Sequence, residues 1–181
     1  MLIQRTLALL LGSLMATSLV GAAARADTST PGSWQQHEYT FNFFGFTTTY
    51  SCQGLEDKLK VLLQMSGAGP GMKVNSPCTR GYGVPDKLVF AYLTFSTLQP
   101  GATSDGEAGQ WRHVALSPRH PFEFDYGDCE LIEQFRDKLL PMFATRNLTN
   151  NVTCVPHQSG TNFNLSYDVF APTPVKKVKK R

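Results

Sequence analysis

Residues 50–63 read YSCQGLEDKLKVLL, and residues 126–140 read YGDCELIEQFRDKLL. Both stretches place a tyrosine shortly before a cysteine, then an aliphatic–Glu pair, and both end in Leu-Leu. Apolar residues recur in each at helical spacing, which predicts two amphipathic helices that begin at the cysteines, with Asp128 as a possible N-cap of the second. The predicted buried faces are Cys52, Leu55, Leu59, Leu62 and Leu63 in the first helix and Cys129, Ile132, Phe135, Leu139 and Leu140 in the second.

The same offset separates other rare residues of the chain. The first cysteines of the two stretches are 77 positions apart, as are the two tryptophans, each of which follows a glycine by two positions. The remaining two cysteines are 76 positions apart. This agreement favours a tandem duplication of one supersecondary unit. The corresponding pairs are Gly32 and Gly109, Trp34 and Trp111, Cys52 and Cys129, and Cys78 and Cys154.

Each copy has strand-like sequence on both sides of its helix. Residues 39–50 alternate apolar and polar side chains, and the alternation changes phase beside Gly45, which predicts two strands. Two prolines mark the same break in the second copy. After the helix, a short strand leads to the second cysteine, and a longer strand follows at 87–98 or 162–170. We therefore predict an α+β fold, in which a strand–strand–helix–strand–strand unit with mainly antiparallel sheet and one helix per repeat occurs twice.

The four cysteines indicate two disulfides. An even number of cysteines is typical of disulfide-bonded exported proteins. Within one copy, the cysteine at the helix start and the cysteine after the next strand can meet across the helix–sheet interface. We therefore predict Cys52–Cys78 and Cys129–Cys154, each closing a loop of roughly 25 residues and contributing about 3 kcal/mol. Crosslinks between the copies are the alternative.

The chain divides into five predicted segments. The first has a positive residue, an apolar run and a small-x-small cleavage site at Ala24-Arg25-Ala26, as in a secretory signal peptide. A retained membrane anchor is the alternative for this segment. The segments are the signal peptide at 1–26, the first repeat at 27–98, a glycine-rich linker at 99–110, the second repeat at 111–172 and a basic disordered tail at 173–181.

The positive charge is concentrated at the C-terminus. Removing residues 1–26 lowers the formal charge from +3 to +1, and the last residues hold five of the positive charges. The remaining body is therefore acidic, which argues against a nucleic-acid-binding domain. The tail is a candidate contact for an anionic envelope surface, or alternatively a solubilising end. Its basic residues are Lys176, Lys177, Lys179, Lys180 and Arg181.

Two groups of residues are weak candidates for chemistry. Glu123 and Asp125 would share a strand face near His120 and could act as an acid–base pair, although a solvated strand face next to a capped helix is the simpler interpretation. His37 and His113 follow the two tryptophans and would approach one another if the copies packed with twofold symmetry, as metal ligands must. Polar surface histidines are the simpler interpretation. No nucleophile elbow, phosphate loop or CxxC motif is present, and we expect no cofactor.

No stretch of the sequence identifies a reaction or a family. The leading hypothesis is a periplasmic or secreted non-enzymatic protein that binds a ligand or protein partner through the surface or cleft between its two repeats. A small secreted hydrolase that uses the acidic and histidine cluster of the second repeat is the first alternative. An envelope-associated protein held by its basic tail is the second.

Overall fold

The computed structural model describes residues 29–78, 83–101, 105–158 and 161–174. Within these residues, all six strands form one antiparallel sheet in the order β2-β3-β1-β4-β6-β5. The elements are β1 (Thr30–Phe44), α1 (Cys52–Met65), β2 (Lys73–Asn75), β3 (Leu88–Pro100), β4 (Glu107–Leu116), η2 (Tyr126–Asp128), α2 (Cys129–Lys138), η3 (Leu140–Met142), β5 (Thr145–Val152) and β6 (Phe163–Pro172). The predicted signal peptide lies outside the described residues.

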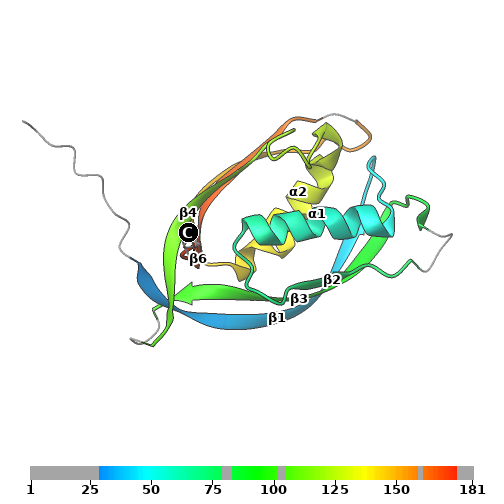
Figure 1. The fold of residues 1–181 in the computed structure, drawn as a ribbon. Helices are drawn as coiled ribbons and strands as arrows, with labels where there is room; N and C mark the ends of the chain where they lie inside the picture. The colour runs from blue at the N-terminus through cyan, green and yellow to red at the C-terminus, as the bar shows by residue number, and fades with distance from the viewer. Residues whose placement is uncertain (1–28, 79–82, 102–104, 159–160, 175–181) are drawn as a thin grey trace, which may run out of the picture.

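The sheet bends round both α-helices. Figure 1 shows β1 and β3 along one arm of the bent sheet, β4 and β6 along the other, and α1 and α2 on the concave side. Each half of the chain runs strand, helix, strand, strand. The predicted α+β class and the antiparallel sheet are therefore confirmed, whereas the duplication remains a hypothesis. No helix in the described part of the chain is long and apolar enough to cross a membrane.

The two arms meet at a short contact between β1 and β4. Residues 30–32 pair with residues 107–109 in antiparallel register, centred on Pro31 opposite Ala108. From this contact β1 continues along β3, and β4 continues along β6. Because the two strands are antiparallel, they leave the contact in opposite directions. The sheet is therefore open on both sides of a three-residue seam.

Close packing at the seam explains the two glycines that precede the tryptophans. A Cβ atom on Gly109 would lie 2.4 Å from the ring of Phe170 and 2.7 Å from Leu98. A Cβ atom on Gly32 would lie 2.8 Å from the same two side chains. Such distances are far shorter than a carbon–carbon contact, so both positions require glycine. The Gly-x-Trp pattern thus marks where the two arms touch.

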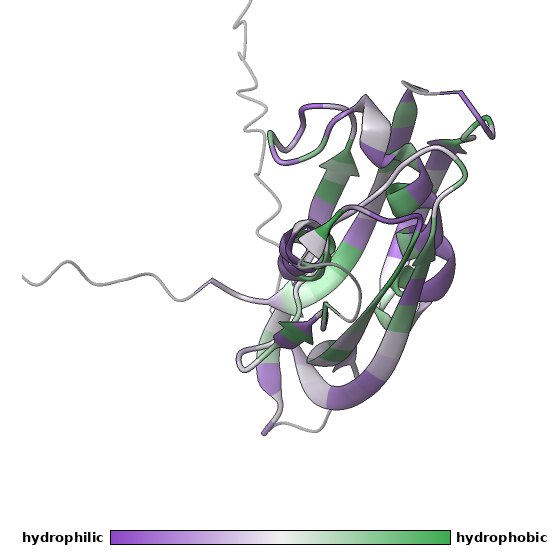
Figure 2. Ribbon diagram, turned by 90° about the vertical axis from the view of Figure 1, so that its right-hand side faces the viewer, coloured by the Kyte–Doolittle hydropathy of each residue, from purple (hydrophilic) through white to green (hydrophobic). Residues whose placement is uncertain are grey.

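The core fills the concave side of the sheet. The buried face of α1 consists of the five residues predicted from its spacing, and the predicted apolar residues of the second helix are buried as well. Bands of hydrophobic and hydrophilic residues alternate along the strands in Figure 2. At the end of β1, for example, Phe41 and Phe43 are buried and Asn42 and Phe44 are exposed. Each large apolar side chain buried here contributes about 1.5–3 kcal/mol.

Both predicted disulfides are present. Cys52 is bonded to Cys78, and Cys129 is bonded to Cys154, so that each half has its helix start joined to the chain after its next strand. The connection between the halves is shorter than the predicted linker at 99–110. Strand β3 continues to Pro100 and β4 begins at Glu107, because both ends of the predicted linker pair at or beside the seam.

The predicted second strand before each helix is wrong. In the first half, β1 ends at Phe44, and the next residues form a loop rather than a strand. The backbone N–H groups of Phe46, Thr47 and Thr48 donate to the carboxylate of Glu130 and have no strand partner. In the second half, β4 ends at Leu116 and is followed by tight turns between residues 117 and 124. Tertiary contacts therefore override the alternating sequence pattern.

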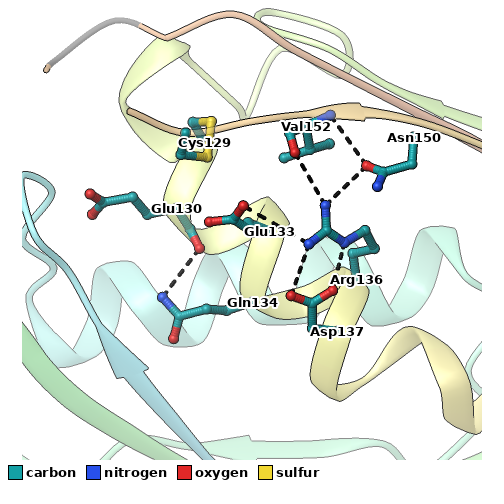
Figure 3. A network of polar contacts seen from close by, with 9 residues as sticks. Cys129, Glu130, Glu133, Gln134, Arg136, Asp137, Asn150 and Val152 are labelled. Carbon is teal, nitrogen blue, oxygen red and sulfur yellow. Dashed lines mark hydrogen bonds and ion pairs between the residues drawn. A yellow bond between two sulfur atoms is a disulfide. The ribbon is translucent and has the colours of Figure 1, made fainter. Parts of the chain in front are cut away.

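Helix α2 is attached to the edge strand β5 through Arg136. Its guanidinium donates to the side-chain oxygen of Asn150 at 3.0 Å and to the carbonyl of Val152 at 3.2 Å, as Figure 3 shows. The neighbouring Asp137 accepts from the same guanidinium at 2.6 and 2.8 Å, which raises the pKa of Arg136 further. This network holds the last helical turns against the end of the sheet.

Candidate functional site

An exposed group of aromatic and aliphatic side chains lies at the end of the β1–β3 arm. Phe44 on β1 pairs with Leu88 on β3, and Phe46 packs edge-on against Phe44 at 5.2 Å between ring centroids. Further along the same face of β3, Phe90 contacts Tyr92 at 5.6 Å. These five residues point away from the core, because Phe41, Phe43 and the alternate residues of β3 fill the concave side. We call them the aromatic patch.

The aromatic patch exposes more apolar surface than a single apolar residue scattered on a protein surface does. Phe44, Phe46, Leu88 and Tyr92 are 47% to 59% exposed. At roughly 200 Å² for a large side chain, these four together expose on the order of 400 Å². Patches of this size that are rimmed by polar residues mark interaction sites on many soluble proteins. Here Thr40, Asn42 and Asn75 form part of the rim on the adjacent strands.

A small hollow adjoins the aromatic patch. It has a volume of about 130 Å³ and shares Leu88 and Phe90 with the patch. Its other walls come from Val84, Asp86 and the region of the Cys52–Cys78 disulfide. Val84 is 67% exposed, so the apolar surface continues into the hollow. A protruding side chain of a partner could enter it.

A second opening lies between the halves, at the seam. It is an open groove of about 370 Å³ between the end of α1, at Gln64 and Met65, and residues 112–115 of β4. We call it the seam groove. The guanidinium of Arg112 crosses it and donates to the carbonyl oxygens of Met65 at 2.7 Å and Gln64 at 3.4 Å. This is the place in the fold that corresponds to the predicted cleft between the two repeats.

The two stretches that resemble each other in sequence are in direct contact. The buried carboxylate of Asp128 accepts from the Tyr50 hydroxyl, from Lys58 Nζ at 2.7 Å and from the backbone N–H of Asp125 at 2.6 Å. Burial, together with the Asp128 charge, raises the pKa of Tyr50 well above its usual value, which keeps the hydroxyl protonated. Asp128 therefore joins the helix start of one half to that of the other.

Glu130 makes a second connection between the halves. It is 7% exposed, and its two oxygens accept from three successive backbone N–H groups of residues 46–48 at 3.1 to 3.4 Å. Successive N–H groups that point at one anion form a nest. Both carboxylates, of Asp128 and Glu130, are thus occupied by donors from the protein itself. Their arrangement is structural.

The other end of α1 is also held by the second half. The Tyr167 hydroxyl on β6 and the Ser66 hydroxyl at the C-cap of α1 are 2.7 Å apart and share a hydrogen bond. Burial raises the pKa of Tyr167 to about 12. Arg112 reaches the last carbonyls of the same helix. Hydrogen bonds from the second half therefore hold both the N-terminal and the C-terminal part of α1. They set the position of the α1 end that forms one side of the seam groove.

The predicted acid–base residues are all exposed. His120, Glu123 and Asp125 follow β4 in the turns that lead to η2. The Asp125 side chain accepts from the backbone N–H of Tyr126 and serves as a local cap, and the Glu123 carbonyl accepts from Lys58. Among the described residues no hydrogen bond or ion pair joins these three side chains. The hydrolase hypothesis therefore rests on the sequence pattern alone.

The two histidines considered as metal ligands lie on different arms of the sheet. His37 on β1 is bonded to the Thr97 hydroxyl at 2.8 Å, and His113 on β4 is 3.0 Å from the Asp168 carboxylate. Strands β1 and β4 run away from the seam in opposite directions, and no contact joins the two histidines among the described residues, so a shared metal site stays a prediction from the sequence. No group of three metal-ligating residues was found in the part of the chain that the structure describes.

His113 instead belongs to a polar row across three strands. The Asp168 carboxylate on β6 accepts from the Asn147 amide at 2.7 Å and lies 3.4 Å from Arg146 Nε, both on β5. These bonds, with Asn147 the largest cause, lower the pKa of Asp168. Arg146 also lies 4.2 Å above the ring of Trp111. The row therefore links β4, β6 and β5 on the exposed face of the second arm.

Comparisons with models of protein families, with curated proteins and with solved structures each found no match. The candidate surfaces are therefore defined by this chain alone. The basic residues of the predicted tail, at 176–181, lie outside the described residues.

Sequence reasoning missed the two features that matter most here. The buried Glu130 carboxylate, which accepts hydrogen bonds from a loop of the other half, was not predicted. The residues of the aromatic patch were not among the predicted site residues either. The signal was available in the change of phase at Gly45, which leaves Phe44 and Phe46 outside the core pattern.

Proposed function

We propose that this protein is an exported, non-enzymatic binding protein whose aromatic patch docks against a protein partner. The observation that supports the proposal is the exposure of Phe44, Phe46, Leu88 and Tyr92 as one contiguous group beside a hollow. Aromatic side chains at the centre of an interface contribute most of its binding energy. An open outer face of a sheet suits a protein surface better than a small molecule, which prefers an enclosed pocket.

The experiment is site-specific photo-crosslinking in intact cells that secrete the protein. A benzoylphenylalanine at position 92 is expected to give one discrete adduct that contains a second protein. The same group at Leu148, which is 51% exposed on β5, is the matched control and should give none. Adding Leu88→Lys should reduce the adduct at position 92 by at least tenfold. Adducts of equal yield at both positions, or none at position 92, would contradict the proposal.

We also propose that the protein acts in the periplasm or outside the cell. The two disulfides support this location, because disulfides persist in oxidising compartments. The basic tail would add a contact to anionic envelope polymers. Comparing envelope retention with and without residues 175–181 across a salt series tests this contact. Retention that is equal at every salt concentration would rule it out.

Finally, we propose that the two halves arose by duplication of one unit. Gly32 pairs with Pro100 as Gly109 pairs with Pro172, and the tryptophans of the two halves keep the same relation to these pairs. The order of strands is also mirrored about the seam. Superposition of the two halves tests this origin: a match that places Cys52 on Cys129 and Trp34 on Trp111 would support it, and a match that requires a different alignment would exclude it.

A further inference from the structure

We propose that the free edge of β4 in the seam groove binds an extended acidic peptide by strand addition. This inference is independent of the aromatic patch, which lies on the other arm. It begins from the pairing of β4, which has β6 on one side along residues 109–116. On its other side it has β1 for only three residues. Residues 110–116 therefore have no strand on that side among the described residues.

The register identifies which backbone groups face the groove. The Ala108 carbonyl accepts from the N–H of Thr173, which continues the β4–β6 ladder by one residue. In an antiparallel ladder, residues that bond to the neighbour alternate with residues that point the other way. Arg112 and Val114 therefore bond to β6. The N–H and C=O groups of Trp111, His113 and Ala115 point towards the seam groove.

These three positions form an edge that suits another chain. Within the described part of the chain, no hydrogen bond reaches their backbone groups from the groove side. Three successive unpaired N–H and C=O positions are the template that strand addition uses. The groove beside them is open, with a volume of about 370 Å³, so an extended segment can approach. The last turn of α1 would form its opposite wall.

Arg112 indicates the charge of the bound segment. Its guanidinium is exposed at the groove and uses only part of its hydrogen-bonding capacity on the helix carbonyls. A carboxylate on the bound strand opposite Arg112 would accept from the remaining N–H groups. A basic segment would be repelled at the same position. The preferred occupant is therefore an extended segment with an acidic residue at its centre.

The test uses a defined probe, the peptide acetyl-Thr-Val-Thr-Glu-Thr-Val-Thr-amide, and hydrogen exchange measured by NMR on the whole mature protein. At saturating peptide, exchange of the N–H groups of Trp111, His113 and Ala115 is expected to slow at least tenfold. The N–H groups of Arg112 and Val114 should change little, because they already bond to β6. A peptide with N-methyl groups on alternate amides, which removes the edge donors, should give no protection.

Charge preference is tested with a second peptide in which Lys replaces the central Glu. The Glu peptide should bind the protein about threefold to tenfold more tightly, and Arg112→Glu should reverse this order. If that variant does not fold, the comparison of the two peptides on the unchanged protein still decides the point. Equal affinity for both peptides would overturn the acidic preference.

Three other results would overturn strand addition at this edge. The first is no protection of the three N–H groups at millimolar peptide. The second is equal protection along the outer edge of β5, which would show unspecific pairing. The third is slow exchange at these positions without peptide, which would mean that residues before β1 or a second copy of the chain already occupy the edge.

Discussion

The carboxylate of Glu130 fixes a loop that belongs to the opposite half of the chain. A backbone segment with three N–H groups free of strand partners is costly to bury unless an acceptor satisfies them. Glu130 supplies that acceptor with one side chain, and the loop in turn positions Phe46 at the end of the aromatic patch. A single residue of α2 therefore shapes a surface on the other arm.

Replacing this acid tests its structural role. Glu130→Gln should lower the free energy of unfolding by about 2–3 kcal/mol, because charge-assisted bonds to several N–H groups are lost. Urea unfolding at pH 7 measures the change. Glu133→Gln on the same helix is the matched control, since its side chain is 37% exposed and its nearest ion pair is long, and it should change stability by less than about 0.5 kcal/mol. An equal loss of unfolding free energy in the two variants would contradict a special structural role for the Glu130 carboxylate.

The seam glycines give a second prediction for single residues. Gly109→Ala should destabilise the protein by about 1–3 kcal/mol, because the new methyl group overlaps the ring of Phe170. Gly127→Ala is the control, because a Cβ there would meet no atom within 4 Å. Thermal unfolding of both variants gives the comparison. If Gly109→Ala left the stability unchanged, Phe170 and Leu98 would have to be able to move aside at the seam, which would contradict the prediction.

At the scale of elements, hydrogen bonds from arginine side chains join elements whose backbones do not pair. Arg136 joins α2 to β5, and Arg112 joins β4 to the end of α1. The polar row around Asp168 adds side-chain hydrogen bonds across β4, β6 and β5, whose backbones are already paired. Such ties matter most where a strand has a free edge, as β4 has.

The row around Asp168 predicts a dependence on pH. The pKa of this carboxyl is lowered, mainly by the hydrogen bond from Asn147, so its contribution is present above the unfolded pKa of about 3.9. The contribution is lost as the pH falls through the lower pKa of the folded state. Asp168→Asn should therefore be less stable at pH 7, by less than about 1 kcal/mol for so accessible a group. Unfolding measured from pH 7 to pH 2 should show the difference shrinking below about pH 4; a constant difference would contradict the assignment.

At the scale of the whole molecule, the two halves share one core. Helix α1 of the first half is held at both ends by Asp128, Tyr167 and Arg112 of the second. The buried residues of both halves form a single cluster on the concave side of the sheet. Halves that exchange so many buried contacts should fold as one cooperative unit.

The two tryptophans allow this cooperativity to be measured, because each half contains one. In Trp34→Phe the fluorescence reports on the second half, and in Trp111→Phe it reports on the first. Each variant's fluorescence transition in urea should coincide with its own transition by circular dichroism. A fluorescence midpoint that differs from the circular dichroism midpoint of the same variant would show that the halves unfold independently.

Much of the architecture follows from local patterns. The spacing of Leu55, Leu59 and Leu62 defines the buried face of α1, and the alternation in residues 163–169 defines that of β6. The candidate surfaces were less accessible to sequence reasoning. Phe44 lies on the outer face of the sheet, and its own stretch does not record whether another part of the fold covers that face.

The sequence by itself determined the two helices, the long strands, the α+β class and the pairing of the cysteines. These depend on periodicity and on short separations along the chain. The tertiary structure alone decided the fate of the two similar stretches, YSCQGLEDKLKVLL and YGDCELIEQFRDKLL. It buried Asp128 and Glu130 against the first half and left the outer face of β1 and β3 uncovered at the aromatic patch. It also separated β4 from β1 beyond the seam, which left a free strand edge. The physical reason is that a buried carboxylate and an unpaired strand edge are both defined by partners distant in sequence, which local patterns do not encode.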